Sequence, residues 1–178
     1  MADLANQSGT FDIGGDLTVH RLGFGGARIT GEGGLGAPAD PEAARDVLRR
    51  AVELGVDFFD TADSYGPCVS ERMLSEVTDE AVVATKTGLL RNPDGDWTPH
   101  GHPDYVRNQV LCSLDRLGVE SIDLYQHHRP DPEVPYEDTI HAFAELKDEG
   151  LVTHVGVSNV TVEQLETARD AVEVATVQ

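Results

Sequence analysis

Apolar residues along this chain occur in short continuous runs, and each run ends at a polar residue. The clearest run, Val56–Phe59, ends at Asp60, and similar runs end at Lys86, His128 and Ser158. Short continuous apolar runs are typical of strands that are buried on both faces. An Asx-type turn after Val56–Phe59 is an alternative explanation for Asp60 taken alone. The recurrence of the pattern instead predicts several buried strands whose polar ends meet at one place.

Segments with helical spacing of apolar residues separate these runs. Asp40 and Pro41 form a typical helix start, and Gly55 provides a stop. Thr161 and Gln164 form a capping pair before the last predicted helix. The sequence therefore predicts five helices, which lie between Asp40 and Gly55, over 70–77, 103–117 and 135–149, and after Thr161.

Six strand candidates alternate with these helices, after a predicted β-hairpin that turns at Gly14-Gly15. Alternation of this kind predicts an α/β fold with a parallel sheet, and residues 1–178 are expected to form a single domain. A doubly wound sheet and a (β/α)8 barrel both satisfy the pattern. The strand candidates are His20–Gly26, Val56–Phe59, the runs that end at Lys86, His128 and Ser158, and Val174–Gln178.

The polar strand ends favour the barrel. In a barrel every strand delivers its carboxyl end to the face where active sites lie, whereas a doubly wound sheet uses its switch-point strands. No G-x-G-x-x-G sequence opens a helix here. The glycines around Gly25 and Gly26 fit either a close approach to a cofactor or simply the loop that follows them.

The composition limits the kinds of molecule that the protein is expected to bind. The chain has 32 acidic and 13 basic residues and a formal charge of −19, which argues against binding to nucleic acid or to an anionic membrane. Such a surface fits a salt-rich, halophilic cytoplasm, and an acidic protein of a mesophile is the alternative. Cys68 and Cys112 lack metal-ligand spacing, so we expect reduced thiols. No signal peptide or membrane span is evident, and we expect a cytoplasmic protein.

Lys86 is the centre of the candidate chemistry. It lies in an apolar run, and a buried ammonium group is costly unless it is paired, so Asp60 is its expected partner. A paired lysine near Tyr65 is expected to lower the pKa of the phenol and make it a general acid. His128 is then placed to orient a substrate oxygen or to assist the proton transfer. The alternative is a structural Asp–Lys ion pair beside a packed tyrosine.

Four ordered motifs together resemble the aldo-keto reductases. They are Asp60-Thr-Ala-Asp-Ser-Tyr65-Gly, Ala84-Thr-Lys86-Thr-Gly, Ile122-Asp-Leu-Tyr-Gln-His-His128-Arg-Pro-Asp and Gly156-Val-Ser158-Asn159. The resemblance implies a (β/α)8 TIM-type barrel that uses NADPH, or NADH, to reduce a small carbonyl compound. It also implies a catalytic tetrad in which Tyr65 donates the proton, Lys86 and Asp60 tune it, and His128 positions the carbonyl.

The same resemblance implies a cofactor site. Ser158, Asn159 and Gln178 are expected to bind the nicotinamide, and Gly25 and Gly26 are candidates for close approach to the cofactor. The chain stops on its sixth strand, whereas the fold needs eight strands and about 250 residues. We therefore expect an incomplete barrel with about six of the eight units, weak NADPH binding and self-association through open edges.

Two other functions remain as alternatives. His127, His128, His100 and His102 suggest a metal-dependent barrel hydrolase. Such an enzyme has no need for a lysine and a tyrosine together, so we expect no metal. A catalytically weak fragment or subunit with a binding or regulatory role is the non-enzymatic alternative.

Overall fold

The computed structural model describes residues 4–178. Its α-helices are α1 (Pro41–Glu53), α2 (Val69–Leu74), α3 (Pro103–Leu117), α4 (Tyr136–Asp148) and α5 (Val162–Ala171), and its 3-10 helices are η1 (Ala5–Ser8), η2 (Gly26–Ile29) and η3 (Glu32–Gly34). Its strands are β1 (Thr10–Ile13), β2 (Leu17–His20), β3 (Phe24–Gly25), β4 (Phe58–Asp60), β5 (Val82–Thr87), β6 (Leu89–Arg91), β7 (Trp97–Pro99), β8 (Ile122–His127), β9 (Val152–Val157) and β10 (Val174–Val177).

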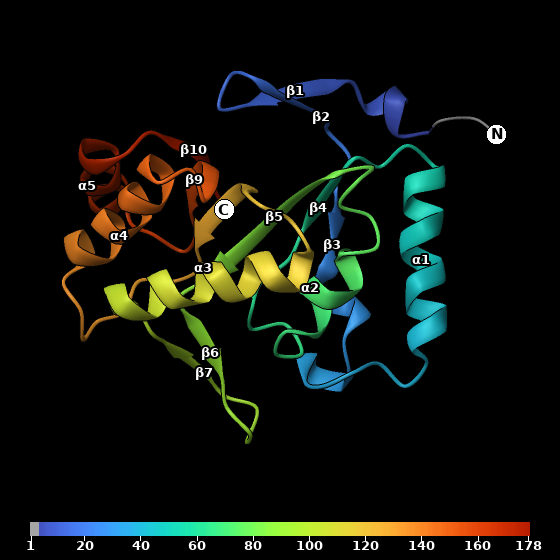
Figure 1. The fold of residues 1–178 in the computed structure, drawn as a ribbon, viewed down its shortest axis with the longest axis horizontal. Coiled ribbons are helices and arrows are strands. Elements are labelled where there is room, and N and C mark those ends of the chain that lie inside the picture. The colour runs from blue at the N-terminus through green and yellow to red at the C-terminus, as the bar shows by residue number, and fades with distance from the viewer. Residues whose placement is uncertain (1–3) are drawn as a thin grey trace.

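The central sheet has six strands in the order β3-β4-β5-β8-β9-β10, and all its neighbours are parallel (Figure 1). This spatial order is the order of the strands in the chain. A doubly wound sheet reverses direction at a switch point, and no such reversal occurs between β3 and β10. The sheet is therefore a partial (β/α)8 barrel, which confirms the predicted fold class.

All five α-helices pack on one face of this sheet. Leu48 of α1, Val110 of α3 and Phe143 of α4 belong to one core cluster with Phe59 and Tyr125 of the sheet. The local signals act as expected from the sequence: Asp40 accepts hydrogen bonds at the start of α1, α3 ends at Gly118 with a φ of 71°, and Thr161 and Gln164 form a capping box.

The opposite face of the sheet is the inner face of the barrel. The predicted hairpin, β1–β2, lies against the amino-terminal ends of the strands (Figure 1). Ile13 and Val19 of the hairpin share a small core cluster with Ala84 and Leu124. The hairpin therefore covers the end of the barrel opposite the polar strand ends.

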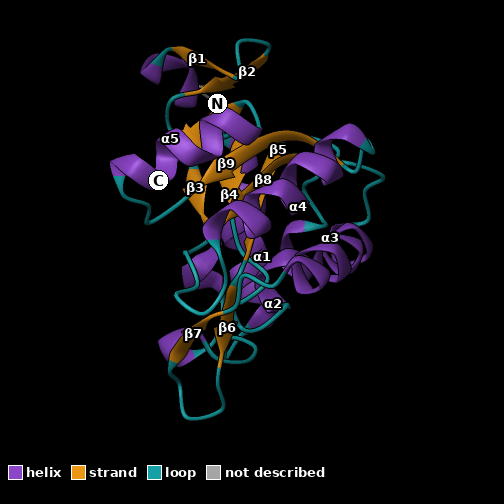
Figure 2. Ribbon diagram, turned by 90° about the vertical axis from the view of Figure 1, so that its left-hand side faces the viewer, coloured by secondary structure: helices purple, strands orange, loops and turns teal. Residues whose placement is uncertain are grey.

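Two segments differ from the sequence prediction. Only Phe24–Gly25 of the expected strand His20–Gly26 pairs with the central sheet, because His20 is taken up by the hairpin, opposite Thr10. A second hairpin, β6–β7, occupies the loop after β5 and projects from the end of the barrel opposite β1–β2 (Figures 1 and 2). Arg91 stacks on Trp97 across it, with the guanidinium carbon 4.2 Å from the ring centroid.

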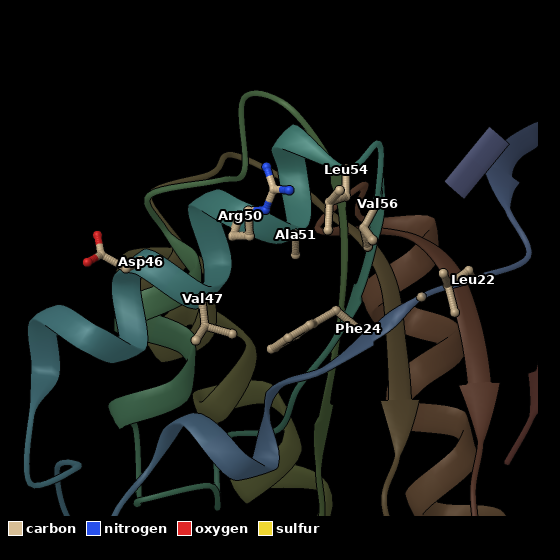
Figure 3. Close-up of a pocket in the computed structure, with 9 residues that line it drawn as sticks. Leu22, Phe24, Asp46, Val47, Arg50, Ala51, Leu54 and Val56 are labelled. Carbon is tan, nitrogen blue, oxygen red and sulfur yellow. The ribbon is translucent and has the colours of Figure 1, made fainter. Parts of the chain in front are cut away.

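The sheet has two edges within residues 4–178, at β3 and at β10. Beside β3, a groove of about 500 Å³ runs between that strand and α1 (Figure 3). Its lining is mostly apolar and consists of Leu22, Gly23, Phe24, Asp46, Val47, Arg50, Ala51, Leu54 and Val56. In the described part of the chain, no helix is long and apolar enough to cross a membrane.

Candidate active site

The carboxyl ends of the parallel strands bring the predicted catalytic residues together. Asp60 ends β4 level with Gly25 of β3, and Lys86 of β5 is level with Gln126 of β8. Gln126 is in turn level with Gly156 of β9. This register places Asp60, Lys86 and Gln126 at the same end of the sheet, with glycines on the flanking strands.

Lys86 and Asp60 form the ion pair expected from the sequence. The Lys86 side chain is fully buried, and its Nζ lies 2.5 Å from Asp60 Oδ1. The same Nζ donates a hydrogen bond to the carbonyl oxygen of Thr61 at 2.9 Å. Burial lowers the pKa of Lys86, and the charge of Asp60 opposes this effect. The carboxylate is thus the main group that keeps the lysine protonated.

The other oxygen of Asp60 is held by amide groups. Gln126 Nε2 donates to Asp60 Oδ2 at 3.1 Å, and Gln178 Nε2 lies 3.4 Å from the same oxygen. Gly156 makes room for Gln126, because a Cβ atom there would lie 2.9 Å from Gln126 Cγ and 2.2 Å from Thr176 Oγ1. Gln126 was not predicted as a site residue, although its position two residues before His128 places both on one face of a strand.

Tyr65 lies over the ion pair. Its ring centroid is 5.5 Å from Lys86 Nζ, and the ring makes edge contacts with His128 at 5.7 Å and with Trp97 at 6.4 Å. The expected lowering of the phenol pKa is wrong: burial, followed by the charges of Asp60 and Asp63, raises the pKa of Tyr65 to about 12. Asp60 lies so close to Lys86 that it offsets much of the positive charge felt by the phenol.

His128 is buried beside this tyrosine. Burial, with a contribution from the charge of Lys86, lowers its pKa to about 3, so the ring is neutral at neutral pH. Its Nδ1 lies 3.4 Å from Ser64 Oγ. The adjacent His127 points to the helical face of the sheet, where its ring packs on Tyr136 and Phe143. Alternation along β8 therefore gives the two histidines different environments.

The three residues expected to bind nicotinamide lie next to one another. Asn159 Nδ2 donates to Ser158 Oγ at 2.8 Å and to the carbonyl oxygen of His128 at 2.9 Å. The backbone nitrogen of Asn159 donates to the carbonyl oxygen of Gln178 at 3.0 Å. Asn159 has a φ of 58°, in the left-handed region that asparagine tolerates better than most residues. These contacts join the ends of β8, β9 and β10.

The two candidate glycines have different surroundings. A Cβ atom at Gly26 would lie 2.6 Å from Ser70 Oγ and 3.2 Å from the carbonyl oxygen of Asp60, so packing alone requires glycine there. At Gly25 a Cβ atom would meet no atom within 4 Å. Gly25 therefore borders open space at the level of Asp60, whereas Gly26 is enclosed.

The histidines of the metal hypothesis are dispersed. His100 packs on the ring of Tyr105 at 4.6 Å, and His102 Nδ1 accepts a hydrogen bond from the backbone nitrogen of Asp104 at the start of α3. Across residues 4–178 there is no group of three or more His, Cys, Asp or Glu side chains arranged to hold a metal ion. The site within the described residues is thus built from an ion pair, a tyrosine and a neutral histidine.

Comparison with known proteins identifies relatives along nearly the whole of this chain. An uncharacterized oxidoreductase of Schizosaccharomyces pombe is 46% identical over 177 residues, which cover 98% of this chain and 58% of the relative. Pyridoxine 4-dehydrogenase of Escherichia coli is 36% identical, with coverage of 97% and 63%. The chain thus spans less than two thirds of the length of these curated relatives.

A solved structure shows the same fold. The glycerol dehydrogenase from Gluconobacter oxydans superposes with a TM-score of 0.87 at 30% identity, over 100% of this chain and 55% of that one. The sequence profile of the Aldo/keto reductase family matches residues 21–178. The chain therefore belongs to the aldo/keto reductase family.

Proposed function

We propose that the barrel built with this chain reduces an aldehyde or ketone to an alcohol with NADPH. One observation carries the proposal: the Tyr65 ring lies over the buried Lys86–Asp60 pair and beside a neutral His128, at the carboxyl ends of the strands. A buried ion pair with no catalytic role does not need a tyrosine and a histidine at its mouth. Residues 1–178 are proposed to act as one domain.

The residues present fit a nicotinamide cofactor. Hydroxyl and amide groups of Ser158, Asn159 and Gln178 can hydrogen bond with a carboxamide, and Gly25 borders open space at the level of Asp60. NADPH, when bound, supplies the hydride that reduces the carbonyl carbon. NADH has the same carboxamide and can form the same hydrogen bonds with these three residues. The choice between the two cofactors therefore depends on groups around the adenosine ribose.

Each residue of the proposed tetrad has a separate task. Tyr65 donates its phenol proton to the carbonyl oxygen, and its raised pKa keeps that proton in place at neutral pH until the oxygen becomes basic. Lys86, kept charged by Asp60, lies 5.5 Å from the Tyr65 ring centroid and offsets part of the cost of the buried phenolate that remains. The neutral ring of His128 can donate a hydrogen bond to the same carbonyl oxygen and orient it.

Replacement of Tyr65 by phenylalanine tests this assignment. Tyr65→Phe removes the proton donor and keeps the ring, so NADPH-dependent reduction of aldehydes should fall by at least about 100-fold while NADPH affinity changes little. Tyr136→Phe, in which a helical tyrosine outside the site loses its hydroxyl, is the matched control. Undiminished reduction by Tyr65→Phe would show that another group donates the proton.

A binding or regulatory role is the second candidate. The chain spans 58% of the S. pombe relative, and both edges of its sheet lack a neighbour within residues 4–178. A regulatory subunit of this kind binds NADPH and a carbonyl compound with no measurable turnover. Fluorescence titration with NADPH, combined with the reduction assay, separates this role from catalysis.

We further propose that a second copy of the chain covers the exposed edges, and that the protein works in a salt-rich cytoplasm. The groove beside β3 presents an apolar surface of the kind that protein association buries (Figure 3). With a formal charge of −19, two copies repel each other at low salt. Light scattering should therefore show the associated form increasing with added KCl, and a monomer at all KCl concentrations would contradict this proposal.

A further inference from the structure

A buried carboxyl group lies at the centre of the loop that carries Tyr65. Asp63 is only 4% exposed, although it belongs to the segment between β4 and α2 rather than to either element. Its Oδ2 accepts a hydrogen bond from Thr87 Oγ1 at 2.7 Å, and Tyr105 Oη lies 3.5 Å from the same oxygen. Its Oδ1 is buried and has no hydrogen-bond partner. A buried carboxyl group in a loop, with one oxygen lacking a hydrogen-bond partner, indicates a role other than packing.

The backbone of Asp63 fastens the same loop. Its nitrogen donates to the carbonyl oxygen of Lys86 at 3.0 Å, and its carbonyl oxygen accepts from the nitrogen of Cys68 at 2.8 Å. Cys68 has a φ of 67°, an unfavourable conformation for a residue other than glycine, and it lies directly before α2. Asp63 therefore ties the loop of Tyr65 to the strand of Lys86 and holds its end in a strained turn.

The surroundings of Asp63 oppose its ionisation. Its pKa is raised to about 7, mainly by burial; the charge of Glu71 acts in the same direction, while the Thr87 hydrogen bond and the charge of Arg116 act against it. The carboxyl group is thus balanced between its neutral and charged forms at neutral pH. The titratable groups that face it are Tyr65 and Cys68 on the loop, Glu71 on α2, Lys86 on β5, Tyr105 and Arg116 on α3, and Tyr125 on β8.

We propose that Asp63 is a positioning residue for proton transfer: it holds Tyr65 over Lys86, and its negative charge opposes loss of the Tyr65 proton. The inference rests on the proposed function and adds a pH control to it. Above neutral pH the charged Asp63 makes the phenol a weaker acid, because a nearby negative charge disfavours the phenolate. Below neutral pH the neutral carboxyl group removes this opposition, so carbonyl reduction becomes faster.

Titration of the carboxyl group tests the inference without any need for turnover. The protein is labelled with ¹³C at its aspartate side chains, and Asp63→Asn identifies the Asp63 signal by its loss. We expect that signal to titrate with a midpoint near pH 7, and the midpoint to rise in Thr87→Val, which removes the hydrogen bond to the charged form. A midpoint below about pH 5, near the ordinary aspartate value, would overturn the inference.

Turnover then tests the link to Tyr65. The kcat for aldehyde reduction by the wild-type protein should fall about tenfold as the pH rises through 7, and Asp63→Asn should lack this inflection. Thr87→Val should lower kcat about tenfold with little change in KM for NADPH, since the loop loses its side-chain hydrogen bond to β5. Asp148→Asn, an exposed aspartate on α4, is the matched control and should behave as the wild-type protein does.

The two experiments separate the inference from the proposed function. If the wild-type protein shows no turnover, the proposed function fails, and the ¹³C titration still decides whether Asp63 is balanced near pH 7. If turnover is present and the pH profiles of the wild-type protein and Asp63→Asn coincide, the proposed function stands and the role of Asp63 is refuted.

Discussion

Asp63 links the stability of the protein to pH in a direction that is unusual for a carboxyl group. Burial raises its pKa from the ordinary 3.8 to about 7, so the folded chain keeps this proton over a pH range in which the unfolded chain has released it. The stabilisation is fully present below pH 3.8 and is lost as the pH rises through about 7. Asp63→Asn, which is always neutral, should escape this loss.

The magnitude follows from the two pKa values. Between 3.8 and about 7, at about 1.4 kcal/mol per pH unit, the loss amounts to about 4 kcal/mol. That is a large part of the stability of a typical domain, which is about 5–15 kcal/mol. The asparagine itself alters the hydrogen bonds with Thr87 and Tyr105 at every pH, which changes the stability by a constant amount. The informative quantity is therefore the change with pH, not the absolute stability.

Two buried histidines titrate in the opposite sense. Burial lowers the pKa of His127 to about 4 and that of His128 to about 3, so their stabilisation is present above the ordinary 6.5 and is lost as the pH falls through those values. Both histidines are present in the wild-type protein and in Asp63→Asn. Subtraction of one stability curve from the other cancels them and leaves the contribution of Asp63.

Urea unfolding followed by circular dichroism supplies the two curves. The free energy of unfolding of Asp63→Asn minus that of the wild-type protein should rise by about 4 kcal/mol between pH 4 and pH 7, and then level off. A difference that stays constant from pH 4 to pH 8 would show that Asp63 ionises normally in the folded state. That result would refute the reasoning from burial.

Three further predictions concern other parts of the fold. Arg116→Met should lower the free energy of unfolding by about 3–5 kcal/mol in urea denaturation, because the fully buried Glu71 loses the guanidinium group whose Nε lies 2.5 Å from Glu71 Oε2. The double variant Glu71→Gln with Arg116→Met should recover much of this loss, and an equal loss in the single and double variants would contradict the pairing. Gly156→Ala should destabilise by about 1–3 kcal/mol in thermal melts, since its Cβ would lie 2.2 Å from Thr176 Oγ1, and an unchanged melting temperature would refute this. The melting temperature should rise with KCl into the molar range as repulsion among 32 acidic residues is screened, and a flat or falling response would argue against the halophilic proposal.

The sequence predicted the Lys86–Asp60 ion pair because Lys86 lies in an apolar run. A lysine among alanines and valines has to be buried, and a buried ammonium group needs a partner, so Asp60 at the end of the neighbouring strand followed directly. The helix ends were predictable for a similar reason: capping groups such as Asp40 and Gly118 act within a few residues of their own position.

The sequence alone did not predict the burial of Asp63 or the raised pKa of Tyr65. Asp63 is flanked by small residues that are typical of an exposed turn, and its partners Thr87 and Tyr105 are 24 and 42 positions away. The sequence also showed that Lys86 is near Tyr65, but not how deeply the phenol is buried or that Asp63 faces it. The sign of its pKa change depends on those two quantities, and burial has the larger effect.

The sequential order of the strands has a consequence for how the chain forms during its synthesis. Each strand of the central sheet from β4 onward pairs with the strand of that sheet made just before it, so every new strand and helix can add to an edge that has already left the ribosome. β5 can pair with β4 before β8 has been translated, and the Lys86–Asp60 contact requires only these two strands. The nascent chain can therefore form the Lys86–Asp60 contact when about half of its residues have been made.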